Sequence, residues 1–563
     1  MPSAFPDAGP SLVLVNGNVL GEAGNCEALA IAGNRIAALG TSAEITALAT
    51  PATEIIDLAG RTVSPGLIDG HAHLDREGLK SVLPSLADCR SVEDIVARIA
   101  AIARTKKPGE WIITMPIGIP PSYEDVLAGI AEHRFPDRHD LDRAAPDNPV
   151  YIRSIWGYWR STLPLVSIAN SRALRLAGID ASTVPPAPSI EICRDTAGEP
   201  NGIFVETNKM PVVEHSLMRR APHFSATERA GALAASMRLY NRAGTTSVFE
   251  GHGIAAEVLD AYRQVRGEGR QTVRASMIFS PAWPSTSAED CRALLKSWGH
   301  WLAGRGLGDA WLGMAGLYGE IDDSVERELR SAAFPQTGWA GFHYNSSLPR
   351  EALREVLIEA ARNGMRAVGI LPNMLDLFAD VDKVAPIAGQ RWVLGHVVSL
   401  TPEQVKQVAG LGLAVTTHLT AYIYKRGSEL VEKLGRERAG EIVPLRSLRE
   451  AGVPISFGSD NAPLSLFQSL LLAIDRRDRM GAVISPEQAL TREEALECAT
   501  LGGAKLTFED AEKGSIATGK LADLAVLSDD PLTCAPDQIA RIESELTIVD
   551  GRIAYRAQAG AGR

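Results

Sequence analysis

The run SPGLIDGHAHLD presents two histidines, His71 and His73, that could bind a metal ion. An apolar stretch leads directly into them. Because side chains alternate along a strand, His71 and His73 point to the same side. Neutral imidazole nitrogen is a preferred ligand of zinc and related divalent cations. The alternative is a pair of surface histidines, but the position at the end of an apolar run favours metal binding.

A carboxylate, Asp460, follows another apolar run in VPISFGSDNAP. It could ligate the same ion, or accept a proton from a water made acidic by the ion and pass it to a leaving group. The alternative is an Asx turn, which Asp before Asn-Ala-Pro forms readily. Together, the histidine pair and this carboxylate favour one shared site.

Further histidines close other apolar runs. His396 ends the strand-like segment RWVLGHVV, and a buried strand-end histidine needs a polar partner, which is either a metal or a backbone carbonyl. We expect it to be a metal ligand. His252 in EGHG, His418 in TTHLTAY and His343 in GFHYNSS have similar positions. We assign His252 and His418 to substrate binding and keep His343 as a candidate ligand.

The segments between these motifs predict an α/β fold. After residue 65, strand-like runs alternate with amphipathic helical stretches, which is typical of a (β/α)8 barrel with its chemistry at the strand C-terminal ends. Nine runs are strand candidates, one more than a barrel needs. Either WAGFHYN or MRAVGIL is therefore expected to be a loop or an edge piece.

The two ends of the chain have a different sequence pattern. Short apolar runs separated by Asn-Gly and Gly-Asn turns predict small sheets that combine into a β-sandwich. We predict sandwich parts at residues 1–63 and 508–563, a barrel at 64–507, and within it an insertion at about 78–223. This insertion is expected to hold its own helices and one strand, and to cap the barrel.

Composition excludes several functions. The chain has 563 residues, a net charge of −11 and an apolar fraction of 45%, which is ordinary for a globular protein. No basic stripe favours nucleic acid, and no apolar run has the length of a signal peptide or a membrane span. Six scattered cysteines form no metal-ligand pair. We expect a cytoplasmic protein with a small-molecule substrate, and the oligomeric state, including a homo-oligomer, stays open.

These motifs, together with LDRAAPDNPVYIR, RDTAGEPNGIFVE and the run from EALECATLGGAKLTF to LADLAVLSDDP, give a resemblance that runs nearly end to end. The chain resembles the amidohydrolase superfamily, most closely its amidohydrolase-3 branch, which includes N-substituted formamide deformylases and exoenzyme-regulatory-type proteins. The resemblance implies a barrel beside a β-sandwich, with one or two divalent cations that activate water, and we expect zinc. His71, His73, His396 and Asp460 match the ligand positions of the family.

The chain also departs from that pattern. In place of the usual fourth-strand lysine it reads GMAGLYGEIDD, which leaves Glu320 as the candidate bridging ligand and puts a two-ion site in doubt. The usual fifth-strand histidine is missing from RAVGILPN, and His343 could replace it. Glu206 matches a family motif but has no evident role. In IWGYWRSTLP, Tyr158 and Trp159 suggest an aromatic pocket wall, although such residues are as often core.

The predicted activity is metal-dependent cleavage of an amide-type C–N bond, with Asp460 as the proton carrier. The bond would belong to an N-acyl compound, a formamide or a cyclic amide, and the substrate could be aromatic or apolar. One alternative is a mononuclear deaminase, ring-opening enzyme or C–C hydrolase on the same fold. An alternative of another class is an inactive barrel with a regulatory or binding role.

Overall fold

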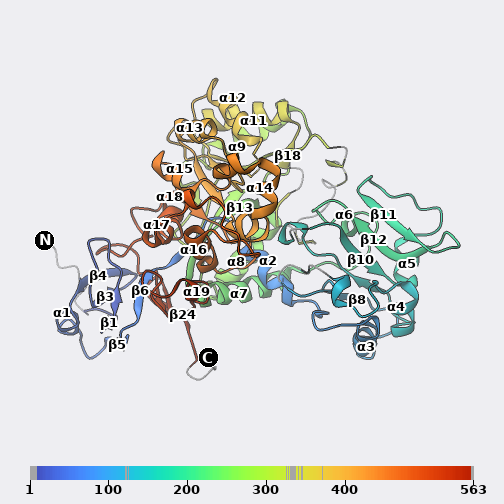
Figure 1. Ribbon diagram of the computed structural model, residues 1–563, viewed down its shortest axis with the longest axis horizontal. Coiled ribbons are helices and arrows are strands. Elements are labelled where there is room, and N and C mark those ends of the chain that lie inside the picture. Colours follow the sequence, from blue (N-terminus) through green and yellow to red (C-terminus); the bar gives the residue numbers. More distant parts are fainter. Residues whose placement is uncertain are drawn as a thin grey trace.

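The computed structural model describes residues 9–558 except 121–122, 124–125, 161, 325, 328, 330–337, 340, 344–345 and 371. Its central barrel lies between a region of small sheets formed by the chain ends and a separate inserted domain (Figure 1). Among the described residues, no helix combines the length and the apolar character that a bilayer crossing requires.

Eight parallel strands form the barrel, as predicted. Their order in the sheet is β7, β13, β14, β16, β19, β20, β21 and β22. The two edge strands meet at their ends, where Gly70 N donates to Phe457 O at 2.8 Å and Asp460 N donates to His71 O at 3.0 Å. The bounds are Leu67–Asp69, Thr245–Ile254, Arg274–Phe279, Leu312–Tyr318, Ala367–Gly369, Val393–Leu394, Ala414–Thr417 and Ile455–Phe457, in that order.

Alternation along the strands divides apolar side chains between the barrel interior and the surrounding helices. In β14, Ile278 packs inside against Phe249 of β13 and Val368 of β19. The neighbouring Met277 belongs instead to the apolar layer with Met237. Strands such as β13 and β21 are buried along their whole length, as expected for a parallel sheet that is covered on both faces. The helices named in Figure 1 that follow them are α7 Ala226–Arg242, α8 Ala256–Gly267, α9 Ala288–Gly299, α11 Arg350–Arg362, α12 Met374–Asp382, α13 Pro402–Gly410 and α15 Leu445–Glu450.

The surplus strand candidate is WAGFHYN. Its described residues Trp339, Gly341, Phe342 and His343 lie in a loop, whereas Ala340, Tyr344 and Asn345 lie outside the described residues. MRAVGIL supplies the fifth barrel strand, β19, so the alternative prediction that MRAVGIL is the loop or edge piece was wrong. The loop ends in β18 (Ser347–Leu348), which pairs with β17 (Glu320–Ile321) outside the barrel.

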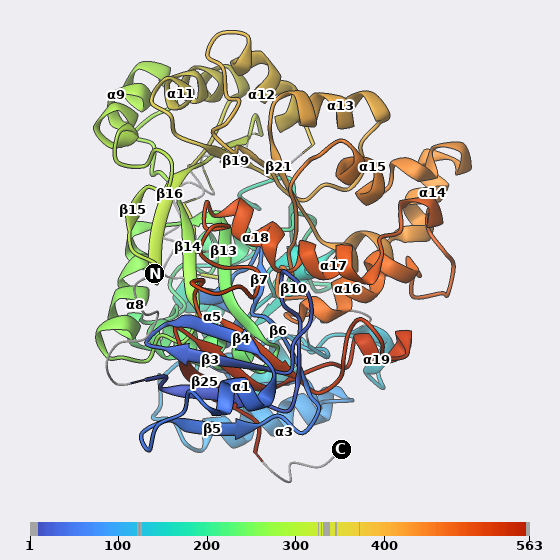
Figure 2. The same cartoon turned by 90° about the vertical axis from the view of Figure 1, so that its left-hand side faces the viewer.

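Strands from both chain ends share one sheet. The order β2, β6, β23, β24, β25 places β6 (Thr62–Pro65) against β23 (Leu524–Leu527), with Ser64 opposite Ala525. Figure 2 shows the N-terminal strands beside β25. The other bounds are β2 Asn18–Val19, β24 Ser544–Val549 and β25 Arg552–Arg556, and the four-stranded sheet is β4 Arg35–Gly40, β3 Ala28–Ala32, β1 Leu12–Val15 and β5 Glu54–Asp57.

The insertion contains a five-stranded sheet, so the prediction of one strand was wrong. Its order is β11, β12, β10, β9, β8. The expected strand, in NPVYIRSIWGYW, is β9. Among the others, β8 has only three residues and β12 begins with Pro-Asn-Gly, a sequence typical of turns, so these two give no clear strand signal. The bounds are β11 Ile190–Arg194, β12 Pro200–Glu206, β10 Leu165–Ala169, β9 Val150–Ile152 and β8 Ile112–Thr114, with helices α3 Val92–Ala103, α4 Arg138–Ala144 and α5 Ser171–Ala177.

Candidate metal centre and active site

Five histidines and one aspartate meet at the C-terminal ends of the barrel strands. His71 and His73 follow β7, His252 lies near the end of β13, and His396, His418 and Asp460 follow β20, β21 and β22, respectively. Barrel enzymes place their chemistry at this end. The structure therefore brings together residues that are distant in the sequence.

His71 lies at the centre of the cluster. The ring centroids of His73, His252, His396 and His418 are 5.2, 5.0, 4.4 and 5.1 Å from its own. Two sets of three histidines bring one nitrogen per ring within 4.8 Å of each other: His71 with His73 and His252, and His71 with His396 and His418. Both sets have the donor chemistry and spacing of a divalent cation site.

The imidazoles are in the state that metal binding needs. Burial lowers the pKa of His71, His73 and His252 well below the usual value, and lowers the pKa of His418 to about 3. For His71, the neighbouring imidazoles lower the pKa further. All of these rings are therefore neutral at physiological pH, and a neutral ring nitrogen can donate its lone pair to an ion.

Unsatisfied nitrogens test whether a cation fits. Within the described part of the chain, neither ring nitrogen of His73 or His252 has a hydrogen-bond partner, although both side chains are buried. His71 Nε2 lies 3.1 Å from His396 Nε2, and His73 Nε2 lies 2.9 Å from Asp460 Oδ1. Buried polar atoms without partners are costly, and a cation among these nitrogens and this carboxylate would satisfy them. The residues present therefore fit a divalent ion.

Buried polar groups hold the first and last strands in register. Asp69 Oδ1 accepts hydrogen bonds from the backbone N–H of His71 at 3.1 Å and of Ser459 at 3.0 Å. Asn461 brackets His73, because its Oδ1 accepts from His73 N at 3.2 Å and its Nδ2 donates to His73 O at 2.7 Å. These contacts fix the backbone of the histidine pair relative to the end of β22.

The backbone is strained where it presents the candidate ligands. His396, Asp460 and Asn461 have φ values of 52°, 48° and 59°. Residues other than glycine rarely adopt this left-handed region, and such strain concentrates at functional sites. The left-handed conformation turns the chain sharply at the strand ends. The His396 ring is then held by a hydrogen bond between Nδ1 and the Tyr422 hydroxyl at 3.0 Å.

The structure thus gathers the four ligands expected from sequence, His71, His73, His396 and Asp460. It also places His252 and His418, expected to bind substrate, within the two histidine sets. Both follow runs of apolar or small residues at strand ends, so their position was visible in the sequence. Their contact with His71 was not, because it depends on the closure of the barrel.

His343 and Glu320 stand apart from both histidine sets. His343 Nε2 lies 3.2 Å from Glu257 Oε2, and among the contacts of the described residues it has none to the five histidines. Glu320 accepts a hydrogen bond from the Tyr318 hydroxyl at 2.5 Å, and the Tyr318 ring packs against His252 at 5.6 Å. Metal ligation by either residue stays a prediction that these contacts do not support.

A small cavity of about 60 Å³ opens onto the centre. Tyr158 lines it, as expected, whereas the buried Trp159 ring packs between Trp339 at 5.7 Å and the Lys80 ammonium at 4.2 Å. The lining residues are Tyr158, Arg160, Lys209, His396, His418, Ala421, Tyr422, Lys425, Arg426, Ser459, Asp460 and Ala462. Three of them come from the insertion, so the insertion forms part of the wall of this cavity.

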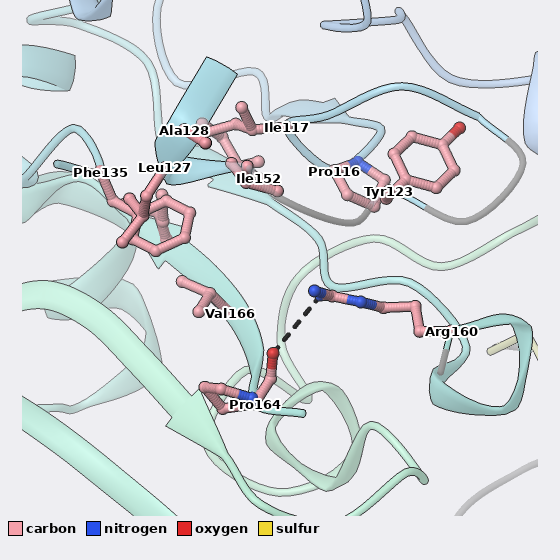
Figure 3. Close-up of a pocket in the computed structure, with 12 residues that line it drawn as sticks. Pro116, Ile117, Tyr123, Leu127, Ala128, Phe135, Ile152, Arg160, Pro164 and Val166 are labelled. Carbon is pink, nitrogen blue, oxygen red and sulfur yellow. Dashed lines mark hydrogen bonds between the residues drawn. The ribbon is translucent and has the colours of Figure 1, made fainter. Parts of the chain in front are cut away.

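A second cavity, of about 330 Å³, lies within the insertion (Figure 3). Apolar side chains such as Leu127, Ile152 and Val166 line it, with Arg160 at its edge. Arg160 Nη1 donates to Pro164 O at 3.4 Å. Arg160 also lines the first cavity, so the two cavities share this residue.

The fold and the site define a metal-dependent hydrolase of the barrel type. Residues 54–555 match the model of the Amidohydrolase family, so the chain belongs to that family and is a hydrolase of carbon–nitrogen bonds other than peptide bonds. It is 27% identical to the N-substituted formamide deformylase of Arthrobacter pascens over 97% of this chain and 98% of that protein. It is 25% identical to the putative amidohydrolase YtcJ of Bacillus subtilis over 90% and 91%.

Solved structures confirm the fold. An uncharacterized metal-dependent hydrolase from Pyrococcus furiosus aligns with a TM-score of 0.66 at 20% identity, covering 93% of this chain and all of that one. At this identity the likeness concerns the architecture alone, and function has to be argued from the site.

Proposed function

We propose that the protein cleaves an amide-type C–N bond, as found in an N-acyl compound, a formamide or a cyclic amide, with a zinc ion held by the histidine cluster. The observation that carries this proposal is the contact of 2.9 Å between His73 Nε2 and Asp460 Oδ1 inside a cluster of neutral imidazoles. The deformylase activity named for the relative from Arthrobacter pascens supports this choice of bond.

The donor sets favour a single ion. Both sets of three histidines include His71, and a neutral imidazole has one nitrogen with a free lone pair. His71 can therefore serve one ion at a time. We propose that His71, His73, His252, His396 and His418 supply the ligands, with Asp460 at the edge of the set.

When bound, the ion supplies Lewis acidity, which polarises the substrate carbonyl and lowers the pKa of water to about 7. Asp460 does the proton chemistry. Its side chain lies beside His73 and also lines the cavity, so its carboxylate can reach both the water and the substrate. It accepts the proton as the C–O bond forms and delivers it to the nitrogen as the C–N bond breaks. The products are a carboxylate and an amine.

Metal analysis and a product assay test the proposal. Protein purified without chelator should contain about one zinc per chain, and chelation should abolish turnover that zinc restores. Carboxylate release from N-formyl and N-acyl substrates without ammonia would support an amidase. Release of ammonia from a ring amine would favour a deaminase. Full activity after complete removal of metal would contradict the proposal.

A further inference from the structure

The cavity beside the histidine cluster has a strongly cationic wall. Its charged lining consists of four cationic side chains, Arg160, Lys209, Lys425 and Arg426, and one carboxylate, Asp460. His396 and His418 also line it, and burial lowers the pKa of both, so their rings are neutral. The protein as a whole has a net charge of −11, so this concentration of positive charge is local.

The cations come from both sides of the cavity. Arg160 and Lys209 belong to the insertion, whereas Lys425 ends the short helix η5 (Thr420–Lys425) after β21 and Arg426 follows it. Lys425 Nζ donates to Trp159 O at 3.5 Å, which joins the two sides. Arg426 is oriented by Glu429, with Nη2 and Oε1 2.8 Å apart. A ligand bound here would contact the barrel and the insertion together.

Lys209 is placed for binding an anion. Its backbone is fixed by Gly157, whose N–H donates to Lys209 O at 2.9 Å, and a Cβ at Gly157 would lie 2.4 Å from that oxygen. Its ammonium lies 5.5 Å from the Tyr158 ring centroid, and among the described residues no carboxylate forms an ion pair with it. Burial and then the charge of Arg426 lower its pKa, whereas the carboxylates of Asp460 and Glu429 raise it. An anion bound in the cavity would stabilise the charged ammonium and so oppose the lowering of its pKa.

We propose that the substrate is an amide that carries a carboxylate, and that Lys209, Lys425, Arg160 and Arg426 bind this group while the amide faces Asp460. The proposal rests on the proposed hydrolysis and adds the chemical class of the substrate. The small size of the cavity favours a carboxylate close to the scissile bond, as in an N-acyl amino acid. A purely apolar substrate would desolvate the Lys209 ammonium without supplying a counter-charge.

Matched substrate pairs test this proposal. For N-formylglycine and N-formylglycinamide, and for the corresponding pairs of alanine and phenylalanine, kcat/KM of the zinc-loaded protein is measured. Where neither member of a pair is hydrolysed, the two dissociation constants are measured by titration calorimetry. The acids should be favoured over the amides by about tenfold or more in at least one pair, which corresponds to about 1.4 kcal/mol. High salt should reduce the preference, because it screens a partly exposed charge contact.

Variants of the lysines test which side chains cause the preference for the acid. Lys209→Gln should remove most of the preference for the acid, and Lys209→Arg should retain it, because the arginine keeps the charge. Lys433→Gln is the matched control, since it removes the same charge from an exposed position on α14 (Gly427–Leu434), outside the cavity. Lys425→Gln gives a second test from the barrel side in case Lys209→Gln folds poorly.

The two proposals fail in different ways. Equal kcat/KM values or dissociation constants for acid and amide in every pair would overturn the anion proposal and leave the proposed hydrolysis intact. An unchanged preference for the acid in both Lys209→Gln and Lys425→Gln would do the same. Tight binding of the acids without turnover of any amide by the zinc-loaded protein would support the anion site and contradict amide hydrolysis.

Discussion

His73 Nε2 lies 2.9 Å from Asp460 Oδ1, although the two residues follow the first and the last strands of the barrel. The contact exists because β7 and β22 are the edges that meet when the sheet closes. It couples a candidate ligand to the candidate proton carrier.

Replacing Asp460 by asparagine should separate ion binding from catalysis. The amide keeps the size and one oxygen but cannot accept the proton, so kcat should fall by at least about a hundredfold. Zinc content, measured by plasma mass spectrometry, should fall much less because the histidines remain. Activity close to that of the wild type would exclude Asp460 as the proton carrier.

Replacing His71 by alanine should reduce the zinc content most strongly. Its ring lies between the others and belongs to both histidine sets, so its loss leaves no complete set of three. His343→Ala is the control, because that histidine pairs with Glu257. The control should keep about one zinc per chain. Equal loss of zinc from both variants would show that His343 is part of the centre.

Asn461 should control metal affinity without touching the ion. Asn461→Asp keeps the acceptor for His73 N but loses the donor to His73 O, and aspartate tolerates the left-handed backbone found there. Zinc affinity, measured with a competing chelator, should fall by roughly 10–100-fold. Tyr240→Phe removes the hydrogen bond of 2.6 Å to Asn461 Oδ1, leaves both contacts between Asn461 and His73 in place, and should have a smaller effect. A larger loss of zinc affinity in Tyr240→Phe than in Asn461→Asp would contradict this role of Asn461.

Glu206 should make the stability of the protein depend on pH. Burial raises its pKa from 4.5 to about 8, so the folded state binds more protons than the unfolded state between these values. The free energy of unfolding should therefore contain a contribution that falls as the pH rises from about 4.5 to 8. In urea titrations, Glu206→Gln should gain stability relative to the wild type as the pH rises. A difference in the free energy of unfolding between Glu206→Gln and the wild type that does not change with pH would contradict this expectation.

Much of the barrel could be predicted from sequence, because the signal for each strand and its polar end lies within one short segment. Each motif with His71, His396 or Asp460 follows an apolar run, so the strand and the polar end are visible in one short segment. Of the sheet in the insertion only β9 was expected, because β8 is short and β12 begins with Pro-Asn-Gly, a sequence typical of turns. The choice between MRAVGIL and WAGFHYN stayed open because both are short runs that contain apolar residues, and the strand in MRAVGIL has only three residues.

The cationic wall could not be predicted from sequence. Lys209 and Lys425 lie in unremarkable segments, and only the packing of the insertion on the barrel brings them to one cavity. Sequence likewise could not show that His252 and His418 lie in the two histidine sets, so their assignment to substrate or to the ion stays a prediction. Distances between strand ends follow from the closure of the barrel, which no local pattern encodes.

The pairing of β6 with β23 has a consequence for biosynthesis. β6 runs directly into β7, and its partner β23 is synthesised after all eight barrel strands. The support of the first histidine pair can therefore form only once the ribosome has completed β23. Because Asp460 follows β22, a nascent chain stalled before β22 would lack this carboxylate and could not assemble the complete candidate centre.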